Sequence, residues 1–295
     1  MDSPLLPIAD ESLILTVAAP AEQTVPLVFA SPHSGRDYPP DFVAMSRLDP
    51  VALRRSEDSF IDELYAGVVG HGAPLLSARF PRAFCDPNRE PYELDPGMFS
   101  GPLPSHANTR SPRVAAGLGT IARVVASGAE IYAGKLPVAE AERRIAAYYR
   151  PYHARLRQMV DTTRHRFGWS LLVDCHSMPS VGGPMDRDMG LSRVDVVLGD
   201  CFGAACSSVF TQTLEDSFRA LGYRVVRNTP YAGGFTTRHY GQPRGGSHAI
   251  QIELNRGLYM NEDRHAKSAG FARLAADLDQ VVADLASCAQ GQSFP

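Results

Sequence analysis

The chain has 295 residues, a formal net charge of −3 and 44% hydrophobic residues. This length leaves room for one domain with a substantial core. The small net charge and the lack of long like-charged runs argue against a nucleic-acid or membrane-surface partner. No apolar run approaches the ~20 residues of a membrane-spanning helix.

A cytoplasmic location is expected from the cysteines and from the start of the chain. The five cysteines are odd in number and contain no C-x-x-C pair, which favours reduced thiols over a disulfide framework. Residues 1–11 are acidic and contain prolines, without the basic start and apolar stretch of a signal peptide. The oligomeric state stays open.

Strands and helices alternate along the chain. In order, the expected elements are a strand over 25–31, a helix over 56–69, a strand over 73–78, a helix over 137–167, strands over 169–175 and 194–198, a helix over 206–221, strands over 223–227 and 249–254, and a helix over 263–286. Pro151 should kink or break its helix near Tyr149. The alternation predicts a single α/β domain over 1–295, with 1–20 as a peripheral extension. We expect a mixed, mostly parallel sheet with helices on both faces.

Two long loops interrupt this alternation. Residues 81–112 are rich in proline and glycine, and loops of this length inside a compact domain are usually functional or disordered. Residues 228–246 are rich in glycine and are interpreted as a mobile lid. The lid carries Tyr231 and Arg238 as candidate substrate contacts.

Two histidines stand at the ends of predicted strands, His33 in the first half of the chain and His176 in the second. In α/β proteins ligands bind in the crevice beyond the strand ends, so two imidazoles there indicate a metal site. A structural role is the alternative for each. Side chains alternate along a strand, so Asp174 shares a face with His176 and is placed to orient its imidazole, whereas Cys175 points to the opposite face.

A third ligand is expected among the acids at the start of the helix predicted over 56–69. Zinc hydrolases usually combine two or three imidazoles with a carboxylate and leave one position for water. Asp58 and Asp62 are four residues apart and share one helix face, whereas Glu57 points about a quarter turn away. The alternative is that Ser56 and the acidic residues after it cap the start of the helix, which explains the same residues equally well.

The strand predicted over 249–254 has one polar and one apolar face. Gln251, Glu253 and Asn255 lie on the polar face. A polar face on an inner strand has no structural need in a sheet that is covered on both sides, so Glu253 is a candidate general base that activates water at a metal. A solvent-facing edge strand is the alternative.

Arginines crowd the stretch 79–89, and Arg82 and Arg89 are the candidates of interest. Guanidinium groups bind carboxylates through two parallel hydrogen bonds, which indicates an anionic substrate. Surface ion pairs with Asp86 and Glu90 are the alternative.

Six short motifs occur in one order along the chain. They are Ser31-Pro32-His33-Ser34-Gly35, Glu57-Asp58, Asp86-Pro87-Asn88-Arg89, Asp174-Cys175-His176-Ser177, Asn228-Thr229-Pro230-Tyr231-Ala232-Gly233-Gly234 and Gln251-Ile252-Glu253-Leu254-Asn255-Arg256. Each is weak alone, but the ordered set, from about residue 27 to 260, resembles the N-formylglutamate amidohydrolase family. That family is similar in fold to zinc carboxypeptidases, so the resemblance implies a zinc-carboxypeptidase-like fold.

The resemblance implies a zinc ion, or another divalent metal, held by His33, His176 and an acid of the Glu57-Asp58 segment. Carboxypeptidases place the carboxylate ligand three residues after the first histidine, but that position is Arg36 in this chain. The ligand must therefore come from elsewhere, and the order of the family motifs favours Asp58 over its acidic neighbours.

The resemblance also implies roles around the metal. Glu253 would activate water and later protonate the leaving amine. Asn88 and Arg89 look like the pair with which carboxypeptidase-type enzymes hold a substrate carboxylate. Arg82 is the arginine that we expect to stabilise the oxyanion.

The expected function is that of a zinc-dependent amidohydrolase. Its substrate would be a small N-acyl acidic amino acid such as N-formyl-L-glutamate, which it would cleave to formate and the amino acid. A related metal hydrolase of another N-acyl amino acid or small peptide is one alternative. A non-catalytic binder of acidic metabolites on the same scaffold is the other. The acyl group and the metal used in the cell stay open.

Overall fold

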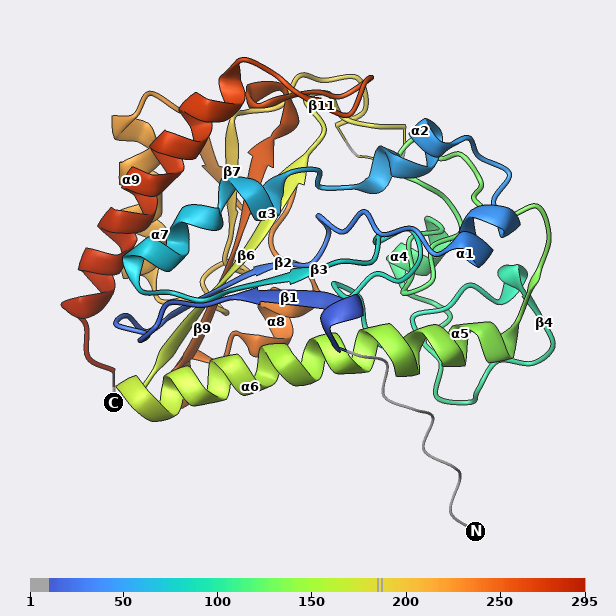
Figure 1. Ribbon diagram of the computed structural model, residues 1–295, viewed down its shortest axis with the longest axis horizontal. Helices are drawn as coiled ribbons and strands as arrows, with labels where there is room; N and C mark the ends of the chain where they lie inside the picture. The colour runs from blue at the N-terminus through green and yellow to red at the C-terminus, as the bar shows by residue number, and fades with distance from the viewer. Residues whose placement is uncertain (1–10, 185, 187, 295) are drawn as a thin grey trace, which may run out of the picture.

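A seven-stranded sheet forms the centre of the computed structural model, which describes residues 11–184, 186 and 188–294 (Figure 1). The strand order is β1-β3-β2-β6-β9-β7-β8. These strands are β1 Leu15–Ala18, β2 Leu27–Ser31, β3 Leu75–Ala78, β6 Ser170–Met178, β7 Val196–Gly199, β8 Val225–Arg227 and β9 Ser247–Asn255. Two small ribbons lie apart from it, β4 Phe99–Ser100 with β5 Leu136–Pro137, and β10 Met260–Asn261 with β11 Ala266–Lys267.

The sheet is mixed and mostly parallel, as predicted. The four central strands β3, β2, β6 and β9 run parallel to one another. At one edge β1 pairs antiparallel with β3, and on the other side β7 pairs antiparallel with β9 and parallel with β8. The carboxyl ends of the four central strands therefore meet at one edge of the sheet, where α/β proteins handle ligands.

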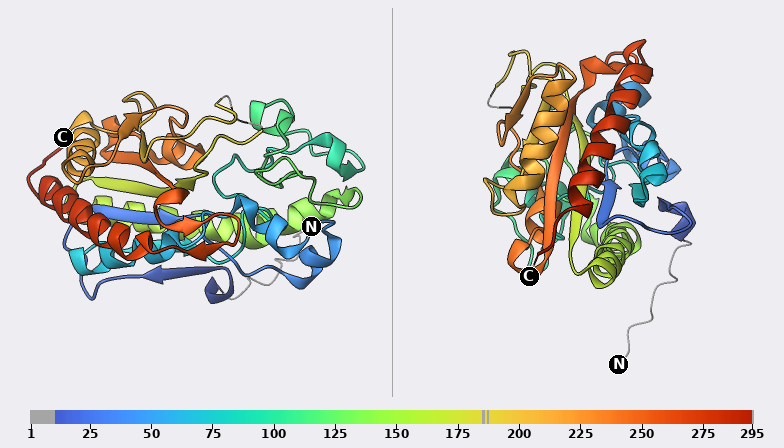
Figure 2. Two further views of the ribbon diagram at one scale, coloured as in Figure 1. Left: turned by 90° about the horizontal axis from the view of Figure 1, so that it is seen from above. Right: turned by 90° about the vertical axis from the view of Figure 1, so that its left-hand side faces the viewer.

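Helices cover both faces of the sheet (Figure 2). The α-helices of the described residues are α1 Pro40–Met45, α2 Pro50–Leu53, α3 Ile61–Leu64, α4 Pro112–Ala115, α5 Val138–Arg144, α6 Arg150–Phe167, α7 Ser208–Ala220, α8 Phe235–Tyr240 and α9 Gly270–Gln290. One core contains apolar side chains of α3, α7 and α9, and the other contains those of α5 and α6. Alternate residues of β6 enter opposite cores, Leu172 on one side and Leu171 and Val173 on the other, which is the period-2 pattern of a strand buried on both faces.

The irregularity expected near Tyr149 is a π-helical turn, Ile145–Tyr149, which joins α5 to α6. The N–H of Arg150 bonds to the carbonyl of Ile145, five residues back. Pro151 follows at the start of α6 and has no N–H to donate. The wider turn accommodates the proline, and the chain continues as a helix through Phe167.

The helix predicted over 56–69 is wrong in its first part. A 3₁₀ turn over Arg54–Ser56 is followed by irregular chain, and α3 begins only at Ile61. The buried carboxylate of Glu57 accepts a hydrogen bond from Tyr38, 19 residues away, at 2.7 Å and a local one from Arg54 at 2.9 Å, so this acid is bound by other side chains rather than placed at a helix terminus. Asp58 therefore shares no helix face with Asp62.

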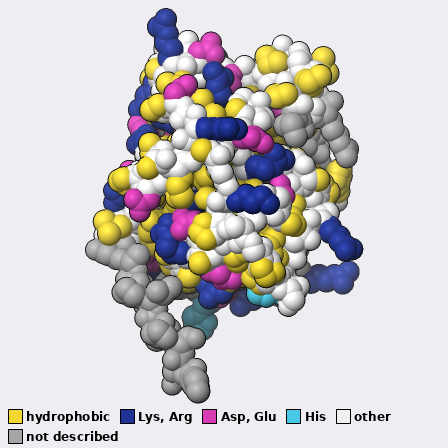
Figure 3. All heavy atoms as spheres, turned by 90° about the vertical axis from the view of Figure 1, so that its right-hand side faces the viewer, with side chains coloured by type: hydrophobic (Ala, Val, Ile, Leu, Met, Phe, Trp, Pro, Cys, Tyr) yellow, Lys and Arg dark blue, Asp and Glu magenta, His cyan; other side chains and the backbone are white. Residues whose placement is uncertain are grey.

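Two other segments differ from the prediction. The glycine-rich loop over 228–246 contains the helix α8, and the last helix begins at Gly270 rather than at residue 263. Part of the extension expected over 1–20 forms the edge strand β1, and residues 1–10 lie outside the described residues. Within the described ranges, no helix combines the length and apolar character needed to cross a membrane. On the face shown in Figure 3, Lys and Arg side chains are interspersed with Asp and Glu.

Candidate metal centre and active site

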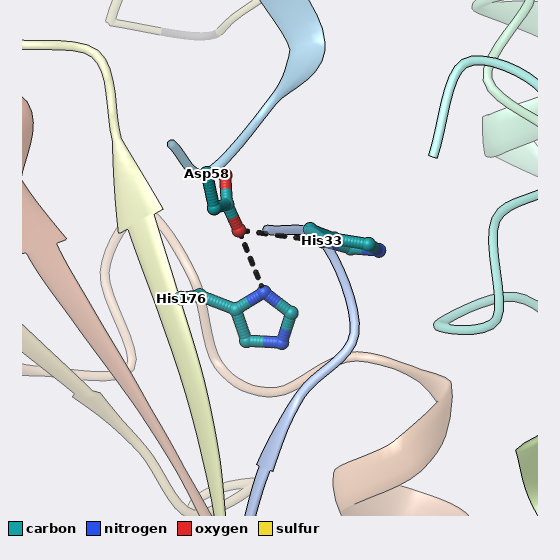
Figure 4. A group of neighbouring side chains, drawn as sticks. All are labelled: His33, Asp58 and His176. Carbon is teal, nitrogen blue, oxygen red and sulfur yellow. Dashed lines mark hydrogen bonds and ion pairs between the residues drawn. The ribbon is translucent and has the colours of Figure 1, made fainter. Parts of the chain in front are cut away.

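Two histidines and one aspartate converge at the carboxyl edge of the sheet (Figure 4). His33 follows β2, His176 belongs to β6, and Asp58 lies in the irregular segment before α3. One ligand atom from each lies within 4.8 Å of the others. Asp58 Oδ2 is 3.0 Å from Nδ1 of His176 and 3.4 Å from Nδ1 of His33. All three side chains are buried.

The backbone explains why these side chains meet. Strands β2 and β6 are neighbours, with Ala30 opposite Asp174, so His33 and His176 leave the sheet side by side. The backbone N–H of Asp58 donates to the carbonyl of His33 at 3.0 Å, which docks the acidic segment onto the histidine turn. A Cβ on Gly35 would lie 2.1 Å from the carbonyl oxygen of Phe80, so only glycine permits this turn.

Each imidazole lies against a second carboxylate on its far side. Nε2 of His33 is 2.7 Å from Oδ1 of Asp86, and Nε2 of His176 is 3.0 Å from Oδ2 of Asp174. A carboxylate at Nε2 favours the tautomer that carries its proton there and leaves the Nδ1 lone pair free for a metal. Nδ1 of His33 is buried and has no hydrogen-bond partner among the described residues. Two imidazole nitrogens and one carboxylate oxygen are a donor set that zinc hydrolases use, so these residues fit a zinc ion.

The second oxygen of Asp58 is held by an arginine. Nη2 of Arg256 donates to Asp58 Oδ1 at 2.9 Å, and Nε of Arg256 donates to Ser177 Oγ at 3.1 Å. This contact leaves Oδ2 facing His33 and His176. Burial opposes the charged form of Asp58, but the contacts with His176 and His33 and the positive charge of Arg82 hold its pKa well below the ordinary value.

Glu253 lies on an interior strand, so the edge-strand alternative is wrong. Its strand β9 runs between β6 and β7, and Glu253 is opposite His176 in the register. Oε1 of Glu253 accepts a hydrogen bond from Nε2 of Gln251 at 2.8 Å. Burial raises the pKa of Glu253 to about 7. A carboxylate with a pKa near neutrality can accept and return a proton, as a general base must.

Arg82 and Arg89 line the same cavity, which has a volume of about 160 Å³. Nη2 of Arg82 forms a 2.8 Å ion pair with Oδ2 of Asp86. This is one of the pairs considered as surface contacts, but both partners belong to the cavity wall. Arg89 uses Nε on the carbonyl of Leu118 and Nη1 on the carbonyl of Asn88, each at 2.8 Å.

Asn88 connects the metal centre to α8. Its Nδ2 is 3.1 Å from Nε2 of His176, and its Oδ1 accepts a hydrogen bond from the backbone N–H of Thr236 at 2.8 Å. Tyr231 lines the cavity. Arg238 does not, because α8 presents it to solvent, where it donates to the carbonyl of Gly233 at 3.0 Å.

Among the polar residues that line the cavity, Asp86, Gln251 and Arg256 were given no catalytic or binding role in the sequence-based prediction. Asp86 begins the motif that contains Asn88 and Arg89, and Gln251 and Arg256 bound the motif around Glu253. Their position in these motifs is the signal that could have identified them.

Comparisons with known proteins identify the family of the chain. The family model for N-formylglutamate amidohydrolase matches residues 25–260. An N-formylglutamate deformylase from Pseudomonas putida is 31% identical over 242 residues, which cover 81% of this chain and 83% of that protein. One from Pseudomonas aeruginosa is 32% identical over 264 residues, which cover 88% and 91% of the two chains.

A solved structure of the same family is similar to this chain over nearly its whole length. The N-formylglutamate amidohydrolase from Ralstonia eutropha JMP134 matches with a TM-score of 0.87 and 36% identity, over 94% of this chain and 99% of that chain. These findings confirm the family resemblance. The chain belongs to the N-formylglutamate amidohydrolase family and is an amide-bond hydrolase.

Proposed function

We propose that this chain hydrolyses N-formyl-L-glutamate to formate and L-glutamate, with a zinc ion held by His33, Asp58 and His176. The names of its relatives support the substrate. The observation that supports the metal site is that the Nδ1 atoms of His33 and His176 both lie next to Asp58 Oδ2, while the Nε2 atoms of the two histidines lie against other carboxylates. A zinc ion bound there would polarise the formyl carbonyl and lower the pKa of water toward ~7.

Glu253 is the proposed general base and acid. It lines the cavity on the strand next to His176, so it can take a proton from the attacking water. The same carboxyl group then donates that proton to the nitrogen of the departing amino acid. The hydrogen bond from Gln251 holds one carboxylate oxygen in place, which leaves the other oxygen for the proton.

Arginines of the cavity are the proposed anion-binding groups. Arg82 is anchored by Asp86, and its charge would stabilise the oxyanion that develops on the formyl oxygen. Arg89, with Asn88 beside it, would bind the α-carboxylate, and Tyr231 would close the cavity wall against the substrate.

Metal analysis and turnover test the proposal together. The purified chain should bind one zinc ion and hydrolyse N-formyl-L-glutamate, and His33→Ala and His176→Ala should each lose the metal. Glu253→Gln should keep the zinc but lose roughly 10²- to 10⁴-fold in kcat. Metal retained in both histidine variants would contradict the ligand set, and near-normal turnover by Glu253→Gln would contradict the mechanism.

We also propose that the protein is cytoplasmic. The five cysteines are free thiols in the structure, namely Cys85, Cys175, Cys201, Cys206 and Cys288, and free thiols are typical of a reducing compartment. Cell fractionation with an antibody against the chain tests this location, and recovery in a secreted fraction would contradict it.

A further inference from the structure

The proposed substrate carries two carboxylates, and most arginines of the cavity are already paired with a carboxylate of the protein. Arg82 contacts Asp86 at 2.8 Å, and Arg256 contacts Asp58 at 2.9 Å. Each of these guanidinium groups neutralises a buried acid next to the metal centre. Their charges are therefore partly compensated before a substrate binds.

The guanidinium group of Arg89 is only partly available to a ligand. Nε and Nη1 donate to backbone carbonyls, and Nη2 lies 3.6 Å from Asp86. Each nitrogen of this guanidinium group therefore already has a protein contact, so Arg89 does not offer a free two-pronged fork to both substrate carboxylates. A second carboxylate on the substrate needs another partner.

Arg113 lines the same cavity and has no carboxylate partner within the described parts of the chain. It lies on the short helix α4, where Ser111 Oγ accepts a hydrogen bond from the N–H of Val114 and Val114 is buried. Its side chain is exposed, so the whole guanidinium fork can receive an anion.

Leu118 connects the two arginines. Its backbone N–H donates to the carbonyl of Arg113 and its carbonyl accepts from Nε of Arg89, both at 2.8 Å. The turn that carries Arg113 is thus attached to Arg89. Both arginines line the same cavity, and repulsion by Arg113 adds to burial in lowering the pKa of Arg89 to about 10, against the opposing charge of Asp86. A dicarboxylate bound between them would relieve this repulsion.

We infer that Arg113 binds the side-chain carboxylate of the substrate, next to the α-carboxylate at Arg89, and thereby sets the preference for an acidic amino acid. This inference rests on the proposed function. Arg238, which was predicted to contact the substrate, points to solvent, and Arg113 is the arginine proposed in its place.

The test compares two substrates of nearly the same shape on the zinc-loaded full chain. N-formyl-L-glutamate carries the second carboxylate, and N-formyl-L-glutamine replaces it with a neutral amide. We expect Arg113→Ala to lower the acid-to-amide ratio of kcat/KM roughly 10- to 100-fold, the loss typical of a charge-assisted pair. The loss should come mainly through KM. Arg113→Lys, which keeps the charge without the fork, should fall in between.

Arg110→Ala is the matched control. Arg110 lies just before α4, three residues from Arg113, is exposed and is not part of the cavity wall, so its loss should leave the ratio unchanged. A ratio that stays the same in Arg113→Ala, or an equal loss for both substrates, would overturn the inference while leaving the proposed function intact. A wild-type enzyme that does not hydrolyse N-formyl-L-glutamate would overturn the proposed function and the inference with it.

Discussion

Replacing Asp174 with asparagine removes one charge beside His176 and changes almost no volume. Asp174 is fully buried, and Nε2 of His176, 3.0 Å away, is its ion-pair partner. A hydrogen bond to a charged group contributes about 1.5–3 kcal/mol, and about 1.4 kcal/mol is a tenfold change in an equilibrium constant. We therefore expect the zinc Kd to rise roughly 10- to 100-fold, the range known for the outer partners of ligating histidines.

The effect should depend on pH with a definite sign. Although burial opposes the charged imidazole, Asp174 raises the pKa of His176 well above the ordinary histidine value of 6.5. His176 must be deprotonated to bind a metal, so protons compete with zinc in the wild type already above that pH. Asp174→Asn lowers this pKa and weakens the competition. The difference in zinc affinity should therefore be largest at alkaline pH and shrink toward pH 6.5.

Competition against a chelating dye measures the zinc Kd directly, without reference to turnover. Asp279→Asn is the control, because Asp279 makes the same kind of contact with His71, Nε2 to Oδ1 at 2.8 Å, on the exposed side of the molecule. It should leave the zinc Kd unchanged. If Asp174→Asn bound zinc as tightly as the wild type at alkaline pH, the proposed role of the carboxylate behind His176 would be refuted.

Three further predictions concern the same site. Because burial raises the pKa of Glu253 to about 7, its basic form is lost below neutrality, so kcat/KM should fall tenfold per pH unit on the acidic side; a profile that stays flat well below pH 7 contradicts the assignment. Arg256→Met removes the 2.9 Å contact to Asp58 and should lower the free energy of unfolding of the metal-free protein by about 1.5–3 kcal/mol. Zinc should restore part of this loss, and denaturant titrations with and without zinc measure both effects. A variant as stable as the wild type would contradict a stabilising role for the contact between Arg256 and Asp58. Cys175→Ala should lower the free energy of unfolding by about 1 kcal/mol but leave kcat unchanged, because the buried thiol belongs to the apolar core on the face of the sheet opposite His176. Loss of turnover with zinc still bound would show that the thiol takes part in the reaction.

The histidines and Glu253 could be located from the sequence because their signals are local. An apolar run that ends in histidine is visible within a few residues, and so is an alternation of glutamine, glutamate and asparagine with isoleucine and leucine. Strand periodicity then determines the face on which each side chain lies. The same periodicity predicts that Cys175 and His176 point to opposite faces of the sheet, and in the structure Cys175 lies in the apolar core on the face away from His176.

The partners of these residues could not be found in this way because they are distant in sequence. Asp58 is 198 residues from Arg256, and His33 is 53 residues from Asp86. The acids before α3 also resemble a helix start, but Glu57 accepts a hydrogen bond from Tyr38, 19 residues away, and the N–H of Asp58 donates to the carbonyl of His33. Local propensity competes here with long-range hydrogen bonding, and the long-range contacts win.

Strand β9 separates two incompatible environments. Ile250, Ile252 and Leu254 face one apolar core, whereas Gln251 and Glu253 face the cavity. Inserting or deleting a single residue in this strand would exchange the two faces, exposing three aliphatic side chains to the ligand cavity and pushing a carboxylate into the apolar core. The length of β9 is therefore as restricted as the identity of Glu253, and changes of chain length in related enzymes should be confined to the loops around the sheet.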